Sequence, residues 1–351
     1  MRRYAIWGTA TSPAHEAWVR DIGKQFERDE FEPVQDVADA DFVLNMFDPE
    51  DPKAFRRSSR GTYSAAFYEL PEAPTDVLKE SYPMLVRTLS NVVLLRVPGQ
   101  GVWFTTMERG TYHVPDDPAE IYERLEPLAT SRLVIDNEWT PDLEPELWGG
   151  DEVSEDIAAA GRRLDELDLL PSPFPVEEYL SGRDLRHVMR LYSVGGLSYG
   201  NLSARKDETR FWMSASGVDK SQLETVGRDL LLVKDFDDER GAIVLSVPPG
   251  IEPRRVSVDA IEHWMIYQAH PDVGAILHVH AWMEGIAATD INYPCGTEEL
   301  AASVAALVAA APDPAHAVVG LRNHGITATG ASLTEILDRI EPDLLRQVPM
   351  S

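Results

Sequence analysis

Residues 254–280, RRVSVDAIEHWMIYQAHPDVGAILHVH, decide the fold of the second half of this chain. The apolar spacing predicts a helix, His270-Pro271-Asp272 predicts a turn, and the apolar run before His278 predicts a buried strand. His278 and His280 are one residue apart, so on a strand both side chains point to the same side. Both imidazoles can therefore reach one metal ion. Asp259 opens the helix and can lie near the strand's end if the two elements are antiparallel, which makes this stretch a plausible active-site frame.

The composition narrows the choice of partners. The chain has 351 residues, enough for two domains, and its hydrophobic fraction of 44% is ordinary for a globular protein. Its formal net charge of −27 repels nucleic acids and anionic membranes. We therefore expect neither as a partner, and we expect a small-molecule substrate. The acidity is explained by solubility or by a high-salt habitat, and charge alone does not separate the two.

Cysteine usage and apolar runs bear on the compartment. Cys295 is the only cysteine, so an intrachain disulfide is excluded, and its Pro-Cys-Gly context favours an inert thiol over a nucleophile. No apolar run reaches the roughly 18 residues of a membrane helix. The first residues have too short an apolar core for a signal peptide and fit a first strand better. We therefore expect a cytoplasmic protein.

Residues 1–135 are expected to form a separate small α/β domain, because strand-like and helix-like segments alternate there. The turn 8–12 follows a strand and precedes a helix, where backbone N–H groups could bind a phosphate. The glycine spacing of dinucleotide-binding turns and the lysine of P-loops are both absent. A structural or assembly role is therefore favoured over nucleotide binding, and the sequence assigns this domain no function.

Residues 136–175 contain acids, prolines and a Gly-Gly pair, which predict an exposed linker with a helix over 155–169. Residues 176–351 are expected to form the second domain, beginning with a helix over 176–192.

Five motifs of this second domain occur in a specific order. A glycine-rich turn over 195–205 enters a strand, and Phe211-Trp-Met-Ser-Ala-Ser-Gly217 follows as the next strand and turn. Then come Ser257-Val-Asp259, the His278–His280 pair and Arg322-Asn-His-Gly325. Over residues 176–340 this series resembles the class II aldolase/adducin family.

The resemblance implies a fold, a metal and a set of site residues. The fold is α/β overall, with a C-terminal α/β/α sandwich around a largely antiparallel central sheet. His278, His280 and His324 match the family's metal-binding histidines, which usually hold zinc. Asp259 stands where the family has its catalytic glutamate, which is also a metal ligand in the resting state. Positions that bind the substrate's phosphate or distal oxygens are matched by Asn201, Ser216, Gly217 and Ser257. The resemblance also implies a homo-oligomer, possibly a tetramer.

The activity implied is that of a zinc- or other divalent-metal-dependent carbon–carbon lyase. Three neutral imidazoles leave one coordination position open, where an ion can polarise a carbonyl and stabilise an enediolate while the carboxylate moves a proton. Retro-aldol cleavage of a small hydroxy-carbonyl compound, possibly phosphorylated, is the first hypothesis. A decarboxylase or epimerase using the same site is the second. A non-catalytic, adducin-like assembly protein is the third, although a scaffold has no need of three histidines at ligand positions.

Departures from the family pattern concern the acid and the substrate. Asp259 is one methylene shorter than glutamate, about 1.5 Å of reach, and Val258 replaces a serine of the phosphate site. Glu262, one turn further on, is the substitute acid. Tyr293 is the nearest candidate for a tyrosine proton donor. His263 and His270 belong to no motif and are expected at the surface.

Overall fold

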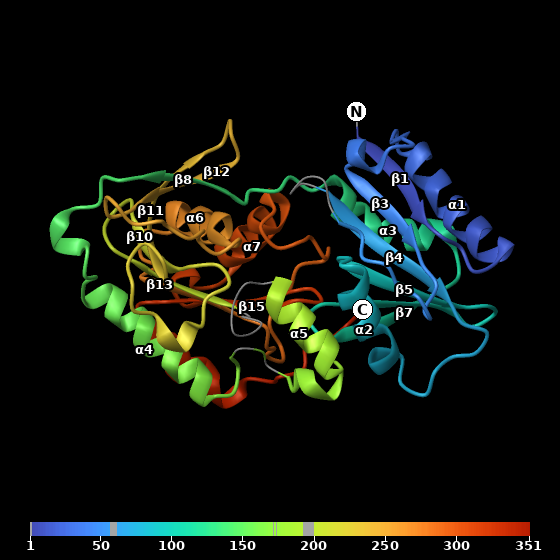
Figure 1. Ribbon diagram of the computed structural model, residues 1–351. Coiled ribbons are helices and arrows are strands. Elements are labelled where there is room, and N and C mark those ends of the chain that lie inside the picture. Colours follow the sequence, from blue (N-terminus) through green and yellow to red (C-terminus); the bar gives the residue numbers. More distant parts are fainter. Residues whose placement is uncertain (1, 57–61, 171, 173, 192–199) are drawn as a thin grey trace. The chain divides into compact units, whose positions relative to one another are not determined.

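The computed structural model describes residues 2–56, 62–170, 172, 174–191 and 200–351, and divides the chain into two compact units (Figure 1). Unit 1 spans Met1–Thr130, Pro175–Val188 and Met350–Ser351, and unit 2 spans Ser131–Phe174 and Met189–Pro349. Helix α5 (Gly182–Leu191) contains the division at residue 188. Each unit mixes helices with strands, so the predicted α/β class is confirmed.

Unit 1 is built on a seven-stranded sheet of order β2-β1-β3-β4-β5-β6-β7. Strands β1 to β5 pair in parallel, and β5, β6 and β7 form an antiparallel meander. Ser12 caps α1 by accepting a hydrogen bond from the His15 backbone N–H, and Pro13 follows at the first helical position, as the sequence predicts. The elements are β1 (Arg3–Gly8), α1 (Pro13–Arg28), β2 (Glu32–Pro33), β3 (Phe42–Met46), β4 (Tyr63–Glu69), α2 (Val77–Thr88), β5 (Val92–Val97), β6 (Gly101–Thr106), β7 (Gly110–Val114) and α3 (Pro118–Thr130).

Unit 2 is built on an eight-stranded sheet of order β14-β15-β13-β9-β10-β11-β12-β8. Its strand pairs are antiparallel except for the parallel pair of β12 with β8. The elements are β8 (Asp136–Thr140), α4 (Glu152–Glu166), β9 (Asn201–Arg205), β10 (Phe211–Ser214), β11 (Leu230–Asp237), β12 (Ala242–Ser246), α6 (Ala260–Ala269), β13 (Ala275–Val279), α7 (Glu298–Ala310), β14 (Val318–Leu321), β15 (Gly325–Gly330) and α8 (Leu333–Ile340).

Helices cover both faces of the sheet in unit 2. Figure 1 shows α6 and α7 on one side of the strands and α4 on the other, where α4 also contacts α8. The ring of Tyr267 on α6 lies 4.7 Å from that of Phe211 on β10, and the Trp212 side chain is fully buried. Burial of these large apolar surfaces is the main stabilising force of the unit. The central strand β13, which carries His278, pairs with β9 on one side and β15 on the other.

The structure differs from the sequence-based expectation in two segments. Residues 136–175, expected as an exposed linker, supply β8 and α4 to unit 2, and Ile157 and Leu164 of α4 are fully buried. The helix expected over 176–192 is divided into a 3₁₀ turn and α5.

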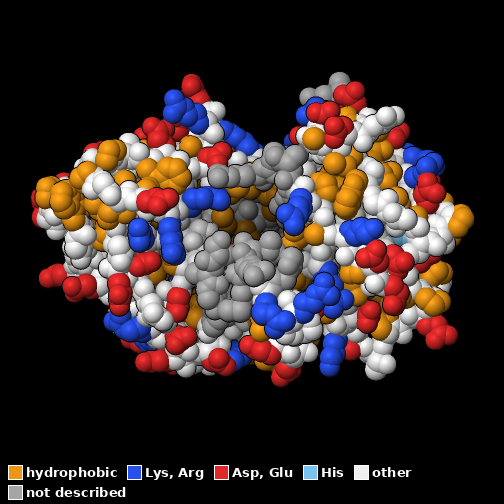
Figure 2. Space-filling model, viewed as in Figure 1, with side chains coloured by type: hydrophobic (Ala, Val, Ile, Leu, Met, Phe, Trp, Pro, Cys, Tyr) orange, Lys and Arg blue, Asp and Glu red, His pale blue; other side chains and the backbone are white. Residues whose placement is uncertain are grey.

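Acidic and basic side chains are mixed on the face of the molecule shown in Figure 2. None of the helices described here has the length and apolar character required to span a bilayer.

Candidate metal centre

The first two histidines come from the central strand of unit 2, as the sequence predicts. His278 lies on β13, opposite Asn201 of β9 on one side and Thr327 of β15 on the other. His280 follows one residue after the strand ends. The period of two along the strand therefore brings both imidazoles to the same place.

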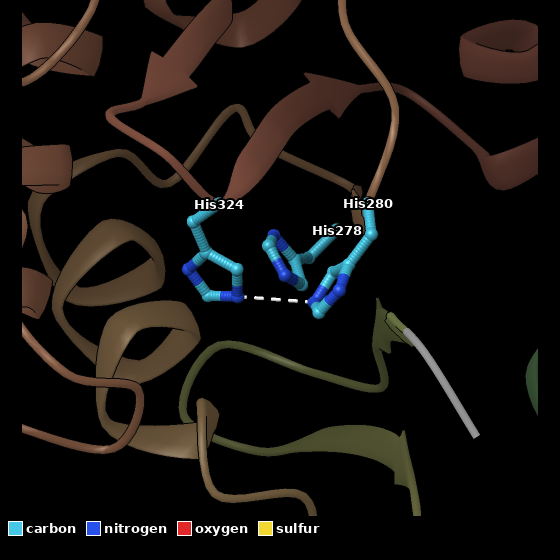
Figure 3. A group of neighbouring side chains, drawn as sticks. All are labelled: His278, His280 and His324. Atoms are coloured by element: carbon cyan, nitrogen blue, oxygen red, sulfur yellow. Dashed lines mark hydrogen bonds between the residues drawn. The ribbon is translucent and has the colours of Figure 1, made fainter. Parts of the chain in front are cut away.

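The third histidine reaches this place through the turn between β14 and β15. Asn323 in this turn has φ 58°, a left-handed conformation that asparagine tolerates better than most residues. A Cβ on Gly325 would lie 2.3 Å from the Val279 carbonyl oxygen, so glycine is needed for β15 to approach β13 this closely. Figure 3 shows the three imidazoles facing one another.

The cluster has the dimensions of a divalent-metal site. Candidate ligand nitrogens of His278, His280 and His324 lie within 4.8 Å of one another, and the Nε2 atoms of His280 and His324 are 3.0 Å apart. Two nitrogens bound tetrahedrally to zinc are separated by roughly 3.3 Å. His278 is 1% exposed, and its Nε2 has no hydrogen-bond partner among the residues that the structure describes. A buried nitrogen lone pair without a partner is costly, and a bound cation would satisfy it.

Burial keeps the three imidazoles neutral. It lowers the pKa of His278 to about 4 and that of His324 to about 3, and it holds the pKa of His280 well below its ordinary value. Neutral imidazole is the form that binds metals. The three imidazoles are therefore in the protonation state that binds metals, and they suit zinc or a similar ion.

Asp259 lies beside this cluster but outside the group of candidate ligands. It occupies the N-cap position of α6 without capping the helix, and its Oδ2 accepts a hydrogen bond of 2.7 Å from the Asn201 amide. The Asn201 amide and the backbone of Gly296 both act to lower the pKa of this carboxyl. Burial nevertheless raises the pKa of Asp259 above its ordinary value. A hydrogen bond thus holds the Asp259 carboxyl in place, and the carboxyl can accept a proton. The Asn201 amide, which was expected to bind substrate, donates this hydrogen bond instead.

Ser216, Gly217 and Ser257 lie in two adjacent loops. An isolated bridge joins Ala215 to Val256, and the Ser257 N–H donates to the Ser214 carbonyl at 3.2 Å. Gly217 has φ 66°, which suits glycine at this turn. The loops flank the N-terminal end of α6, where the polar groups suit an anion. The part of the glycine-rich turn at 195–199 lies outside the described residues.

Two polar residues of α6 are buried, and the sequence had predicted one of them, His263, at the surface. His263 was expected at the surface, but it is fully buried, and its Nδ1 lies 2.7 Å from the Ser203 hydroxyl. Burial lowers the pKa of His263 to about 3. Glu262 is 2% exposed, and its Oε1 accepts a hydrogen bond of 2.6 Å from Thr327. A helix of low amphipathicity gives no pattern that separates its buried polar residues from its exposed ones.

Lys220 and Cys295 are two further groups near the cluster that motif spacing did not indicate. Lys220 is 3% exposed, and burial lowers its pKa to about 8. The Cys295 Sγ lies 3.2 Å from Nε2 of His324. A lysine in a short 3₁₀ turn and a cysteine in a Pro-Cys-Gly loop both look like surface residues, and only the tertiary fold brings them here. The Arg205 guanidinium donates to the backbone carbonyls of Tyr267, His270 and Val273.

Comparison with known proteins places this region in a family. Residues 185–290, which include Asp259, His278 and His280, match the model of the Class II Aldolase and Adducin N-terminal domain. The resemblance to the class II aldolase/adducin family is confirmed for this segment. His324 lies beyond the matched segment.

Individual relatives match shorter stretches of the chain, and a solved structure matches a longer part at lower sequence identity. Methylthioribulose-1-phosphate dehydratase from Klebsiella pneumoniae subsp. pneumoniae is 35% identical over 81 residues, which is 23% of this chain and 34% of that protein. The enzyme of the same name from Xanthomonas campestris pv. campestris is 34% identical over 87 residues, 25% of this chain and 35% of that protein. The chain thus spans about a third of the length of these relatives. A solved structure, L-fuculose 1-phosphate aldolase, superposes with a TM-score of 0.38 at 20% identity, covering 55% of this chain and 82% of the other.

Proposed function

We propose that this chain is a metal-dependent lyase that acts on a small hydroxy-carbonyl compound. The cluster of His278, His280 and His324 carries the proposal, because its three neutral imidazoles face one another from separate parts of one sheet. A divalent ion held there would polarise a substrate carbonyl. Unit 2 would then be the α/β/α sandwich of the family, with its site at the end of β13.

Asp259 is the residue we propose for proton transfer. Its carboxyl is buried, which strengthens its interaction with a reacting group, and burial raises its pKa, which makes it a better proton acceptor than an exposed aspartate. The hydrogen bond from Asn201 fixes its position. In retro-aldol cleavage, Asp259 takes the proton of the hydroxyl group on the carbon β to the carbonyl. The bond between the α and β carbons breaks, and the α carbon is later reprotonated.

Dehydration is the second candidate reaction. The named relatives are dehydratases, and in a dehydration Asp259 would take the proton from the carbon next to the carbonyl. Removal of that proton and departure of the β-hydroxyl group, protonated as water, balance the reaction. Decarboxylation and epimerisation need the same carbonyl activation. An adducin-like assembly role is disfavoured, because assembly does not require inward-facing histidines.

The substrate's polar end would lie against the loops of Ser216, Gly217 and Ser257, which offer hydroxyl and N–H donors beside the start of α6. With Val258 in place of a serine, fewer hydroxyl groups are available to a phosphate than in the family pattern. From the resemblance we also propose a homo-oligomer, which light scattering of the purified protein tests.

The experiment that tests the function is a product analysis. Metal-loaded protein is incubated with hydroxy-aldehydes, ketose phosphates and β-hydroxy ketones, with and without a chelator. A retro-aldol lyase gives two carbonyl fragments, whereas a dehydratase gives one product lighter by one water. Absence of chelator-sensitive turnover across such a panel, in protein shown to hold the metal, counts against a lyase.

A further inference from the structure

A second buried carboxyl, Glu262, lies behind the histidine cluster and has no role in the proposed reaction. It is 2% exposed, and burial together with the charge of Asp259 raises its pKa to about 8. Its Oε1 accepts a hydrogen bond from Thr327, and within the described part of the chain its Oε2 has no partner. A buried carboxyl destabilises a fold unless something compensates for the lost hydration. Its position therefore calls for an explanation beyond packing.

Thr327 connects this carboxyl to the cluster. It lies on β15 directly opposite His278 of β13, is fully buried, and its Oγ1 is 3.4 Å from Nδ1 of His278. A hydroxyl group has one hydrogen to donate and lone pairs to accept. Because the Thr327 hydrogen is directed to Glu262, its oxygen is left to accept from His278.

This direction of hydrogen bonding determines the tautomer of His278. An Nδ1 that donates to Thr327 carries the ring's proton, so Nε2 keeps its lone pair. Nε2 is also the nitrogen of His278 that is buried without a partner.

We propose that Glu262 and Thr327 are positioning residues that fix His278 in the Nδ1–H tautomer and so present its Nε2 lone pair to a metal ion. This inference rests on the proposed function. Residues that orient metal-binding histidines in this way typically contribute 10- to 100-fold to metal affinity or activity. Glu262 acts only through Thr327, since no direct contact between its carboxyl and a histidine of the cluster is found among the described residues.

The proposed roles of Thr327 and Glu262 predict different zinc affinities for matched pairs of substitutions. Thr327→Val removes the hydroxyl at nearly constant shape, and we expect zinc to bind about 10- to 100-fold more weakly. Thr327→Ser keeps the hydroxyl and restores affinity to within a few-fold. Glu262→Leu frees the Thr327 hydrogen to donate to Nδ1, which favours the wrong tautomer and weakens binding. Glu262→Gln still offers an oxygen to Thr327 and restores affinity.

A control separates positioning from general destabilisation. Thr329 is also fully buried on β15, but its hydroxyl donates to the Pro314 carbonyl rather than contacting the cluster. Thr329→Val is therefore expected to lower stability without changing zinc affinity. Affinity is measured on the full chain by competition with a chelating dye, alongside thermal unfolding of the metal-free form.

The tautomer is also measurable in the unsubstituted protein. Nitrogen NMR of ¹⁵N-histidine-labelled, metal-free protein should show His278 protonated at Nδ1. Protonation at Nε2, or unchanged zinc affinity in folded Thr327→Val, overturns the positioning role and leaves the proposed function intact. Parent protein that binds no metal at all overturns the proposed function, and the inference with it.

Discussion

Replacing Asp259 with asparagine separates proton transfer from metal binding. The substitution keeps the shape of the side chain. Its amide oxygen can still accept the hydrogen bond from Asn201, which is 2.7 Å long in the unsubstituted protein. It removes the group that we propose as the acid and base. Because Asp259 lies outside the group of candidate ligands, the three histidines should still hold the ion.

The size of the effect follows from the role. A positioned acid or base contributes about 10²- to 10⁴-fold to a rate, which corresponds to about 2.7 to 5.4 kcal/mol of activation free energy. The nearest substitute, Glu262, is occupied with Thr327, so we expect the full loss in this range. Stability of the metal-free protein near neutral pH should not fall, since the variant no longer buries a carboxyl whose pKa is raised by desolvation.

The assay follows incorporation of deuterium from heavy water next to the carbonyl of a substrate found in the product screen, with metal content measured on the same samples. Asp229→Asn is the control, because the Asp229 carboxylate accepts from the Glu224 and Thr225 N–H groups in a loop. Exchange that survives Asp259→Asn at the parent rate, in protein with full metal content, would refute the role of Asp259.

Two further predictions concern stability. Gly296 has φ 73°, and a Cβ there would lie 2.8 Å from Cγ2 of Ile135 and 3.1 Å from the Val258 carbonyl oxygen. The left-handed conformation alone costs about 1–2 kcal/mol, so we expect Gly296→Ala to lower the free energy of unfolding by more than this. Gly285→Ala, at φ 77° in open space, is the matched control in denaturant titration, and equal losses in both variants would remove the packing argument. Glu262 has its pKa raised to about 8 in the folded, metal-free protein, so it is protonated there between its unfolded value near pH 4.5 and pH 8 and ionised in the unfolded chain. Its contribution to stability therefore falls as pH rises through this window, by up to about 1.4 kcal/mol per pH unit. Glu262→Gln should accordingly gain stability over the parent as pH rises from 5 to 8, and a pH-independent difference between the two proteins contradicts the assignment.

The parts of the fold that were predictable are those with strong local signals. Ser12 and Pro13 mark the start of α1, and the apolar run before His278 marks β13. Strand β4 was missed because its residues are buried on both faces, so the sequence YSAAFYE shows no alternation of polar and apolar residues. Residues 136–175 were predicted to be an exposed linker because α4 is rich in acidic residues and buries only one narrow face.

The site was predictable to different degrees for each residue. The His278–His280 pair follows from spacing on a strand, whereas His324 is 44 residues further along and was indicated only by the resemblance. Lys220 could not be predicted, since its burial depends on long-range packing and its immediate sequence resembles a surface turn. Asn201 was predicted to be at the site, but its hydrogen bond to Asp259 depends on the register between β9 and β13.

The central claim, that three histidines hold one metal ion, is tested most directly by metal analysis. Purified protein is loaded with zinc, dialysed and analysed by mass spectrometry, beside a His278→Ala/His280→Ala variant and a His270→Ala control. The account predicts about one ion per chain in the parent and the control, with none in the double variant. Parent protein without metal, or a double variant that keeps as much metal as the parent, would contradict it.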